Sequence, residues 1–143
     1  KSSRAAASLR GGKTLPLYGR LPTQKVGEKI RGEIESLTPA PPELDQVSDA
    51  YGLYVNDDRM YPRYKLGEVV LINPTRPPKI GDDVVIQFGN EGTLEFWDQV
   101  PEIWELTGWE GDKISLRQFN PPVSKQVGRR DVVFVHRIEI ARR

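Results

Sequence analysis

The sequence contains no cysteine, a single histidine and a single methionine among its 143 residues. The absence of cysteine excludes disulfides and thiolate metal sites, and one histidine, His136, is too few for a histidine metal cluster. No apolar run is long enough to cross a membrane, and no signal peptide is visible. We therefore expect no cofactor, no bound metal, no membrane partner and a cytoplasmic location. Because Met60 is the sole methionine, we also expect the chain to be part of a longer protein.

Net charge is also small, at +1, so the overall charge indicates no particular partner. The charges are nevertheless segregated along the chain. Residues 81–112 contain nine acidic residues and no basic one, whereas residues 113–143 contain eight basic and two acidic residues. We favour an interpretation in which these are solvated faces of one domain. The alternative is a pair of complementary surfaces that meet in a head-to-tail or isologous contact.

Short runs of strand-forming residues, separated by glycine, proline, asparagine and aspartate, predict an all-β domain. We expect residues 1–14 to form a flexible basic tail and residues 15–143 to form one folded domain. The expected strands are 15–21, 30–37, 53–55, 69–72, 84–88, a return strand that starts at Thr93, 114–119 and 131–140. Residues 38–49 are rich in proline, which allows no helix longer than a turn or two.

The connection between the strands at 53–55 and 69–72 is the stretch most suggestive of function, because functional residues often lie on loops between rigid strands. It reads Asp57-Asp58-Arg59-Met60-Tyr61-Pro62 and leads through a glycine into a Val/Leu-rich run. This order resembles the core motif of the self-cleaving LexA and phage-repressor peptidases, Gly-Asp-Ser-Met-x-Pro followed by a strand. Asp58, Met60 and Pro62 match it. The resemblance implies a LexA-type C-terminal domain with a signal-peptidase-like fold: mixed, highly twisted small sheets of short strands, similar to a β-clip.

The same resemblance places Arg59 where the family has its nucleophilic serine. A guanidinium stays protonated and cannot attack a carbonyl, so the motif indicates the fold and argues against the reaction. On the expected return strand, Glu95 occupies the place of the catalytic lysine. We hypothesise an Arg59–Glu95 ion pair in the former active site; the alternative, that both side chains face solvent, stays open.

The cleavage site of the family also has a degraded counterpart. A short strand is followed by Leu21-Pro22-Thr23-Gln24, where the resemblance implies small residues that can bend into the active site. Pro22 fixes its own φ angle and restricts Leu21, so this segment is a poor substrate. With Pro22 and Thr23 as the remnant of the cut site and Arg59 as the remnant of the nucleophile, we predict that the chain does not cleave itself.

Large side chains in the second half are candidate contacts for a second copy or another partner: Trp97, Trp104, Trp109, Phe134 and Arg137. For the tryptophans we favour a place in the core or a dimer contact over a ligand-stacking surface, given the apolar area that each one buries. His136 has no nucleophile or acid within a recognisable motif, so we interpret it as an ordinary strand side chain.

Three functions remain after these observations. The first, implied by the resemblance, is an inactive dimerisation and regulatory domain of a phage- or prophage-type transcriptional repressor. Such a domain would form a homodimer or a higher homo-oligomer. Its other partners would be operator DNA, bound through an N-terminal helix-turn-helix domain outside this chain, and an antirepressor protein. The second is an active peptidase that uses Ser115 or Ser124. The third is a small β-barrel that binds nucleic acid through residues 113–143 and the tryptophans.

Overall fold

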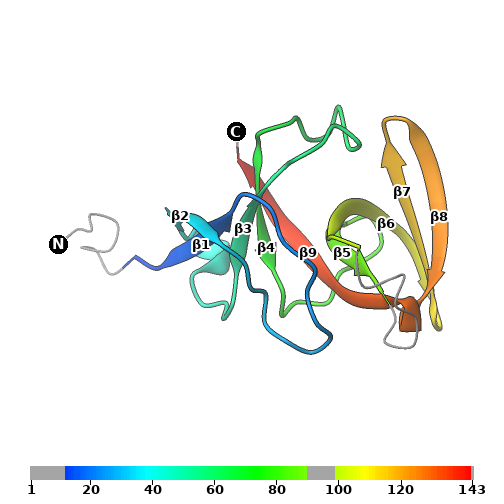
Figure 1. Ribbon diagram of the computed structural model, residues 1–143, viewed down its shortest axis with the longest axis horizontal. Coiled ribbons are helices and arrows are strands. Elements are labelled where there is room, and N and C mark those ends of the chain that lie inside the picture. Colours follow the sequence, from blue (N-terminus) through cyan, green and yellow to red (C-terminus); the bar gives the residue numbers. More distant parts are fainter. Residues whose placement is uncertain (1–11, 90–98, 143) are drawn as a thin grey trace.

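The computed structural model describes residues 12–89 and 99–142, and in these ranges the protein is all-β, as predicted (Figure 1). The strands are β1 Thr14–Tyr18, β2 Ile34–Pro39, β3 Tyr51–Tyr54, β4 Val69–Asn73, β5 Asp83–Phe88, β6 Glu102–Glu110, β7 Lys113–Phe119, β8 Pro122–Gly128 and β9 Val132–Arg142. Two single-turn 3-10 helices, Pro42–Leu44 and Arg129–Asp131, complete the described elements. No helix in the described ranges is long and apolar enough to cross a membrane.

The nine strands form one hydrogen-bonded sheet in the order β2-β1-β3-β4-β9-β5-β6-β7-β8. Every neighbouring pair is antiparallel except β1 and β3, so the sheet is mixed, as the family resemblance implies, although it is one sheet and not several small ones. β9 pairs along Arg137–Arg142 with β4 and along Val132–Arg137 with β5. Figure 1 shows β9 running diagonally between the strands on the left and those on the right. This long strand therefore joins two halves of the domain.

The core follows from the alternation of side chains along β5, which is buried throughout. Val85 packs into a first cluster, while Val84 and Ile86 face a second one. The first cluster has these buried members: Tyr18, Leu21, Tyr51, Leu53, Val55, Met60, Tyr64, Val70, Ile72, Val85 and Ile138. A third, smaller cluster lies under β1 around Leu15, Leu44 and Leu71. The loop that carries the repressor-like motif thus contributes directly to the first cluster.

Most expected strands are present, with ends displaced by a few residues. β8 was not expected. The prediction that Asn120-Pro121-Pro122 ends a strand is correct, but the chain turns there and re-enters the sheet at once. β8 is an exposed edge strand, so it carries no apolar alternation that a sequence pattern could reveal. The expected start of the return strand at Thr93 lies outside the described residues, and the next described strand, β6, is the one that returns along β5.

Some of the acidic residues in 81–112 form ion pairs with basic residues in 113–143. Arg117 on β7 contacts Glu105 on β6, with 2.9 Å between Nε and Oε1, and Arg137 on β9 contacts Asp82, with 3.4 Å between Nε and Oδ2. Each pair joins an acid from residues 81–112 to a base from residues 113–143. The acidic and basic segments are therefore complementary within one chain, in addition to forming solvated surface.

Candidate functional site

The loop between β3 and β4 is anchored to the first core cluster by two buried side chains, Met60 and Tyr64. Main-chain hydrogen bonds tighten it, because the amides of Arg63 and Tyr64 both donate to the carbonyl of Met60, at 2.7 and 3.3 Å. The Tyr61–Pro62 peptide within this turn is cis. The two buried side chains and the hydrogen bonds to Met60 give the loop a defined shape, with residue 59 directly before this anchor.

The turn between β7 and β8 holds the other side of the loop. The amides of Phe119 and Asn120 donate to the carbonyl of Arg59 at 3.0 and 2.9 Å, and the Asn120 side-chain amide donates to the carbonyl of Asp58 at 3.1 Å. Three hydrogen bonds from a turn about 60 residues further along the chain thus fix the main chain of the motif. The Asn120-Pro121-Pro122 turn has a positioning role that the sequence alone did not reveal.

The side chain of Arg59 lies at the surface, with 48% of it exposed, and reaches two carboxylates. Its Nη1 is 3.2 Å from Glu102 Oε2, and its Nε is 4.0 Å from Asp57 Oδ2. Glu102 is oriented in turn by Trp104, whose indole nitrogen donates to the other carboxylate oxygen at 2.8 Å. The predicted partner, Glu95, lies outside the described residues, so that pair stays a prediction. Within the described residues the principal acidic partner of Arg59 is Glu102.

A second charged network lies beneath the same loop, built around Arg63. Its guanidinium donates to both oxygens of Asp83 at 2.8 and 3.0 Å, and to Glu105 at 3.0 Å. Asp83 and Glu105 are opposite each other in the β5–β6 pairing, so two carboxylates face one another with Arg63 between them. Tyr64 donates to Asp83 at 2.6 Å, and Arg117 donates to Glu105 at 2.9 Å.

Burial governs the protonation of this network. Desolvation raises the pKa of Asp83, while the hydrogen bonds from Tyr64 and Arg63 oppose that shift. Burial also raises the pKa of Tyr64 well above its ordinary value, and its hydrogen bond to Asp83 adds to the effect. For Arg63, burial works to lower the pKa, but Asp83 and then Glu105 outweigh it and raise the pKa. Both arginines also stack on one ring, since the Arg63 and Arg117 guanidinium carbons lie 4.8 and 5.2 Å from the centroid of Phe119.

Residues 19–33, which we call the strap, connect β1 to β2 (Figure 1). The strap contributes Leu21 to the first core cluster, and its Ile30 packs against the same cluster. Gln24 and Gln87 of β5 are both buried and bond reciprocally. The Gln24 amide donates to Gln87 Oε1 at 2.8 Å, and Gln87 Nε2 donates to the Gln24 carbonyl at 3.1 Å. The Gln24 side chain then bridges the strap, as it donates to the carbonyls of Pro22 and Arg31 and accepts from the Arg31 amide. The main chain of the strap at Gln24 therefore bonds to the side chain of Gln87, and not to the main chain of a neighbouring strand.

Pro22 and Thr23, which we predicted to be the remnant of a cleavage site, lie on this strap. Leu21 is buried in the same cluster as Met60, so strap and motif loop share one core. Pro22 is exposed and its carbonyl accepts from Gln24, while Thr23 is half-buried. Gln24 and Gln87 were not singled out from the sequence. A buried glutamine in an otherwise apolar strand was the available signal, because such a group needs hydrogen-bond partners.

The other predicted residues are dispersed. Trp104 is a core residue that stacks edge-on against Phe88 at 6.1 Å between centroids, and Trp109 is partly buried against the same cluster. Phe134 is partly buried against the first cluster and lies 4.4 Å from His136 between ring centroids. Trp97 lies outside the described residues. The side chain of Arg137 is largely buried by contacts with acids of its own chain.

His136 and the two serines have local roles. His136 Nδ1 lies 2.8 Å from the hydroxyl of Tyr51, and burial lowers the pKa of His136 to about 4. The hydroxyl of Ser115 accepts a hydrogen bond from Gln126 at 3.3 Å, and Ser124 is exposed on β8. In the described ranges no lysine bonds to either serine. The structure therefore does not assemble a Ser–Lys pair from these residues.

With this geometry established, one comparison is informative. The chain is 36% identical over 130 residues to Repressor protein C of Rhizobium phage 16-3. The similarity relates the chain to a phage repressor. It covers 90% of this chain and 49% of the relative, so the chain spans about half the length of the repressor it matches. No protein-family model matches the chain.

Proposed function

We propose that the chain is the dimerisation and regulatory part of a phage-type transcriptional repressor, and that it has lost the ability to cleave itself. The similarity to Repressor protein C and the all-β fold support the repressor assignment. The observation that carries the loss of cleavage is Arg59, which stands at the nucleophile position with its guanidinium 3.2 Å from a carboxylate of Glu102. A cation held by acids has neither a proton to lose at neutral pH nor a lone pair for attack.

The surroundings of Arg59 support the same conclusion. Self-cleavage of the family's kind needs a hydroxyl next to a neutral, desolvated amine that acts as base. In the described residues, the ionisable groups within ion-pairing distance of Arg59 are the carboxylates of Asp57 and Glu102. Asp83 and Glu105 are paired with Arg63 of the same loop. Both arginines of the loop are therefore held in ion pairs with carboxylates.

Repression by such a domain follows from effective concentration. A single DNA-binding head holds a half-site weakly, and pairing two heads makes the second contact intramolecular, which raises affinity by about 10²–10⁴-fold. In cleavable relatives, a cut between the domains would cancel that gain. Without the cut, release from the operator requires another input, for which an antirepressor protein is our candidate.

A fusion experiment tests the pairing role. The chain is joined to a DNA-binding head that does not dimerise by itself, and repression is measured at operators with two half-sites and with one. We expect tighter binding only at the two-site operator. The matched control is the same fusion carrying Val85→Asp, which places a charge in the first core cluster and abolishes the fold. Equal binding by the head alone and by the intact fusion would contradict the proposal.

A further inference from the structure

β2 is one of the two edges of the sheet, and its outer side is not paired with any other described strand. Edge strands of monomeric proteins usually carry protection against pairing with another chain, such as proline or lysine. β8, at the opposite edge, begins with Pro122 and carries Lys125 in its middle. β2 has no lysine, and its proline, Pro39, is its last residue. β2 does carry a register shift against β1, but of the two edges it is the one with neither a lysine nor a proline before its last residue.

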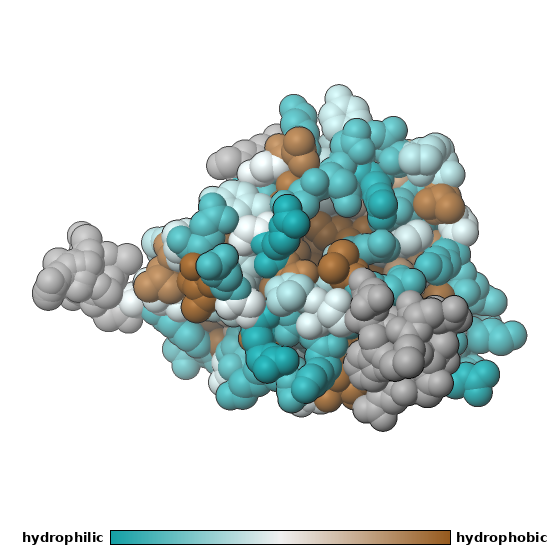
Figure 2. All heavy atoms as spheres, in the orientation of Figure 1, coloured by the Kyte–Doolittle hydropathy of each residue, from teal (hydrophilic) through white to brown (hydrophobic). Residues whose placement is uncertain are grey.

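The register of β2 collects its large apolar side chains on one face. Leu37 pairs with Pro16, and Ile34 pairs with Tyr18, with a register shift between Leu17 and Tyr18. Pro16 and Tyr18 are two residues apart and so point to the same face, which puts Leu37 and Ile34 on a common face as well. Both are exposed, at 63% and 52%. In Figure 2 most of the visible face is hydrophilic, and one of its separate hydrophobic spots lies over the β1–β2 region at the left.

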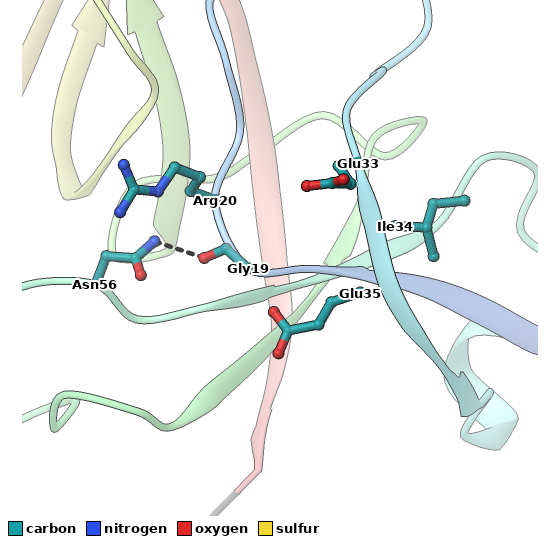
Figure 3. Close-up of a pocket in the computed structure, with 6 residues that line it drawn as sticks. All are labelled: Gly19, Arg20, Glu33, Ile34, Glu35 and Asn56. Carbon is teal, nitrogen blue, oxygen red and sulfur yellow. Dashed lines mark hydrogen bonds between the residues drawn. The ribbon is translucent and has the colours of Figure 1, made fainter.

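Opposite charges stand at the two ends of this strand. Glu33 and Glu35 line a groove of about 580 Å³ at the first end, together with Arg20 (Figure 3), and neither glutamate has an ion-pair partner in the described residues. At the other end, Arg142 donates to Thr38 Oγ1 at 3.2 Å and to the Pro39 carbonyl at 3.3 Å, again without a carboxylate among the described residues. With two carboxylates and one guanidinium, the groove at the start of β2 has a net negative charge, whereas Arg142 makes the other end positive.

We propose that two copies of this chain pair through β2, antiparallel, about a two-fold axis perpendicular to the sheet near Ser36. This inference rests on the pairing role proposed above and names its surface. The axis places Ile34 and Leu37 of both copies on the same face, where they contact across the new strand pair. It also brings Arg142 of each copy to the groove lined by Glu33 and Glu35 of the other. We choose a second copy as the partner because the apolar face and the opposite charges at the two ends of β2 match those of an antiparallel β2.

The spacing of the chain ends agrees with this arrangement. β1 begins at Thr14, the residue paired with Pro39. From the rise along a strand and the spacing between strands, the two Thr14 residues would lie about 25 Å apart. Half-sites of dimeric helix-turn-helix repressors are about 34 Å apart. The 13 residues that precede Thr14 have a contour length of about 40 Å, which is enough to cover the difference on both sides.

The test measures the dimer dissociation constant of the full chain by sedimentation equilibrium. Leu37→Lys is expected to weaken the dimer by about tenfold or more, because it places a cation on the buried face of the new strand pair. Val123→Lys, at an apolar residue of β8 that is 44% exposed, is the matched control and is expected to leave the dimer intact. Circular dichroism confirms that both variants fold.

A charge exchange tests the two ends. Glu33→Arg and Arg142→Glu are each expected to weaken the dimer several-fold, and the double variant is expected to recover most of the loss. A dimer that survives Leu37→Lys, or that dissociates with Val123→Lys, overturns the β2 assignment and leaves the pairing role intact. A wild-type chain that stays monomeric at all accessible concentrations overturns both this inference and the pairing role, and binding of β2 to a different protein would then be examined.

Discussion

Arg59 and Arg63 lie four residues apart on one loop, and each pairs with a glutamate of β6, yet their surroundings differ. The Arg59–Glu102 pair is open to solvent, whereas Arg63 contacts Asp83 and Glu105, whose side chains are only 6% and 10% exposed. Exposed pairs contribute little to stability, because solvent screens them and ordering two long side chains costs entropy. A buried network costs more to disrupt than it contributes when complete, since removing one member leaves an unpaired charge. We therefore expect Arg59 to contribute little to the stability of the fold and Arg63 to contribute much more.

The largest effect is expected from Arg63→Met, which leaves Asp83 and Glu105 facing each other without the shared cation. We expect the free energy of unfolding to fall by about 3 kcal/mol, the lower end for a broken buried pair, because Arg63 itself is partly exposed. Urea denaturation at neutral pH measures it. A loss no larger than that of Arg59→Met would remove the distinction between the two arginines.

The partly buried contact between His136 and Tyr51 extends the comparison to pH. Burial lowers the pKa of His136 to about 4 in the folded protein, against 6.5 for the ordinary side chain, so the unfolded chain takes up the proton first. Stability is therefore complete above about pH 6.5 and falls as the pH drops toward 4, by about 2 kcal/mol between about pH 7.5 and about pH 5.

His136→Gln provides the matched variant, since its amide oxygen can still accept from the hydroxyl of Tyr51 but does not titrate. The difference in urea midpoints between wild type and variant, followed with pH, isolates the contribution of the histidine from that of the carboxylates. Parallel curves for the two proteins would show that His136 is not held in a desolvated, neutral form.

Gln87→Leu tests the contact between strap and sheet, and the expected loss is about 1–2 kcal/mol. The substitution leaves the main-chain amide and carbonyl of Gln24 buried without their partners. We expect trypsin to cut faster at Lys25, Lys29 and Arg31 of the strap, because local opening becomes easier. Gln126→Leu, on the exposed strand β8, serves as the control. Unchanged strap cleavage would mean that Leu21 alone holds the strap.

The smallest effect is expected from Arg59→Met, with a loss below about 1 kcal/mol that shrinks further at high salt. The same urea titration at low and high ionic strength measures it. A loss as large as that of Arg63→Met would show that Arg59 belongs to the buried network.

The sequence was sufficient for the fold class because the apolar runs of β4 and β5, with glycine and proline between strands, leave few alternatives. It was insufficient for β8, whose polar residues join the sheet only because β7 offers a free edge. The contact of Arg59 with Glu102 could not be predicted either, since it depends on the register of β6 against β5. Arg63 was overlooked because nothing in its own neighbourhood indicates that Asp83 and Glu105 face each other. That pairing of like charges exists only in three dimensions.

The central claim, that a cation has replaced the nucleophile, is tested most directly by intact-mass spectrometry of the chain after prolonged incubation at alkaline pH, with and without an activated recombinase filament. A cleavable repressor processed in parallel shows that the conditions support cleavage. We predict a single species at the mass of the uncut chain in both samples. A pair of fragments that meet near Pro22 would contradict the account.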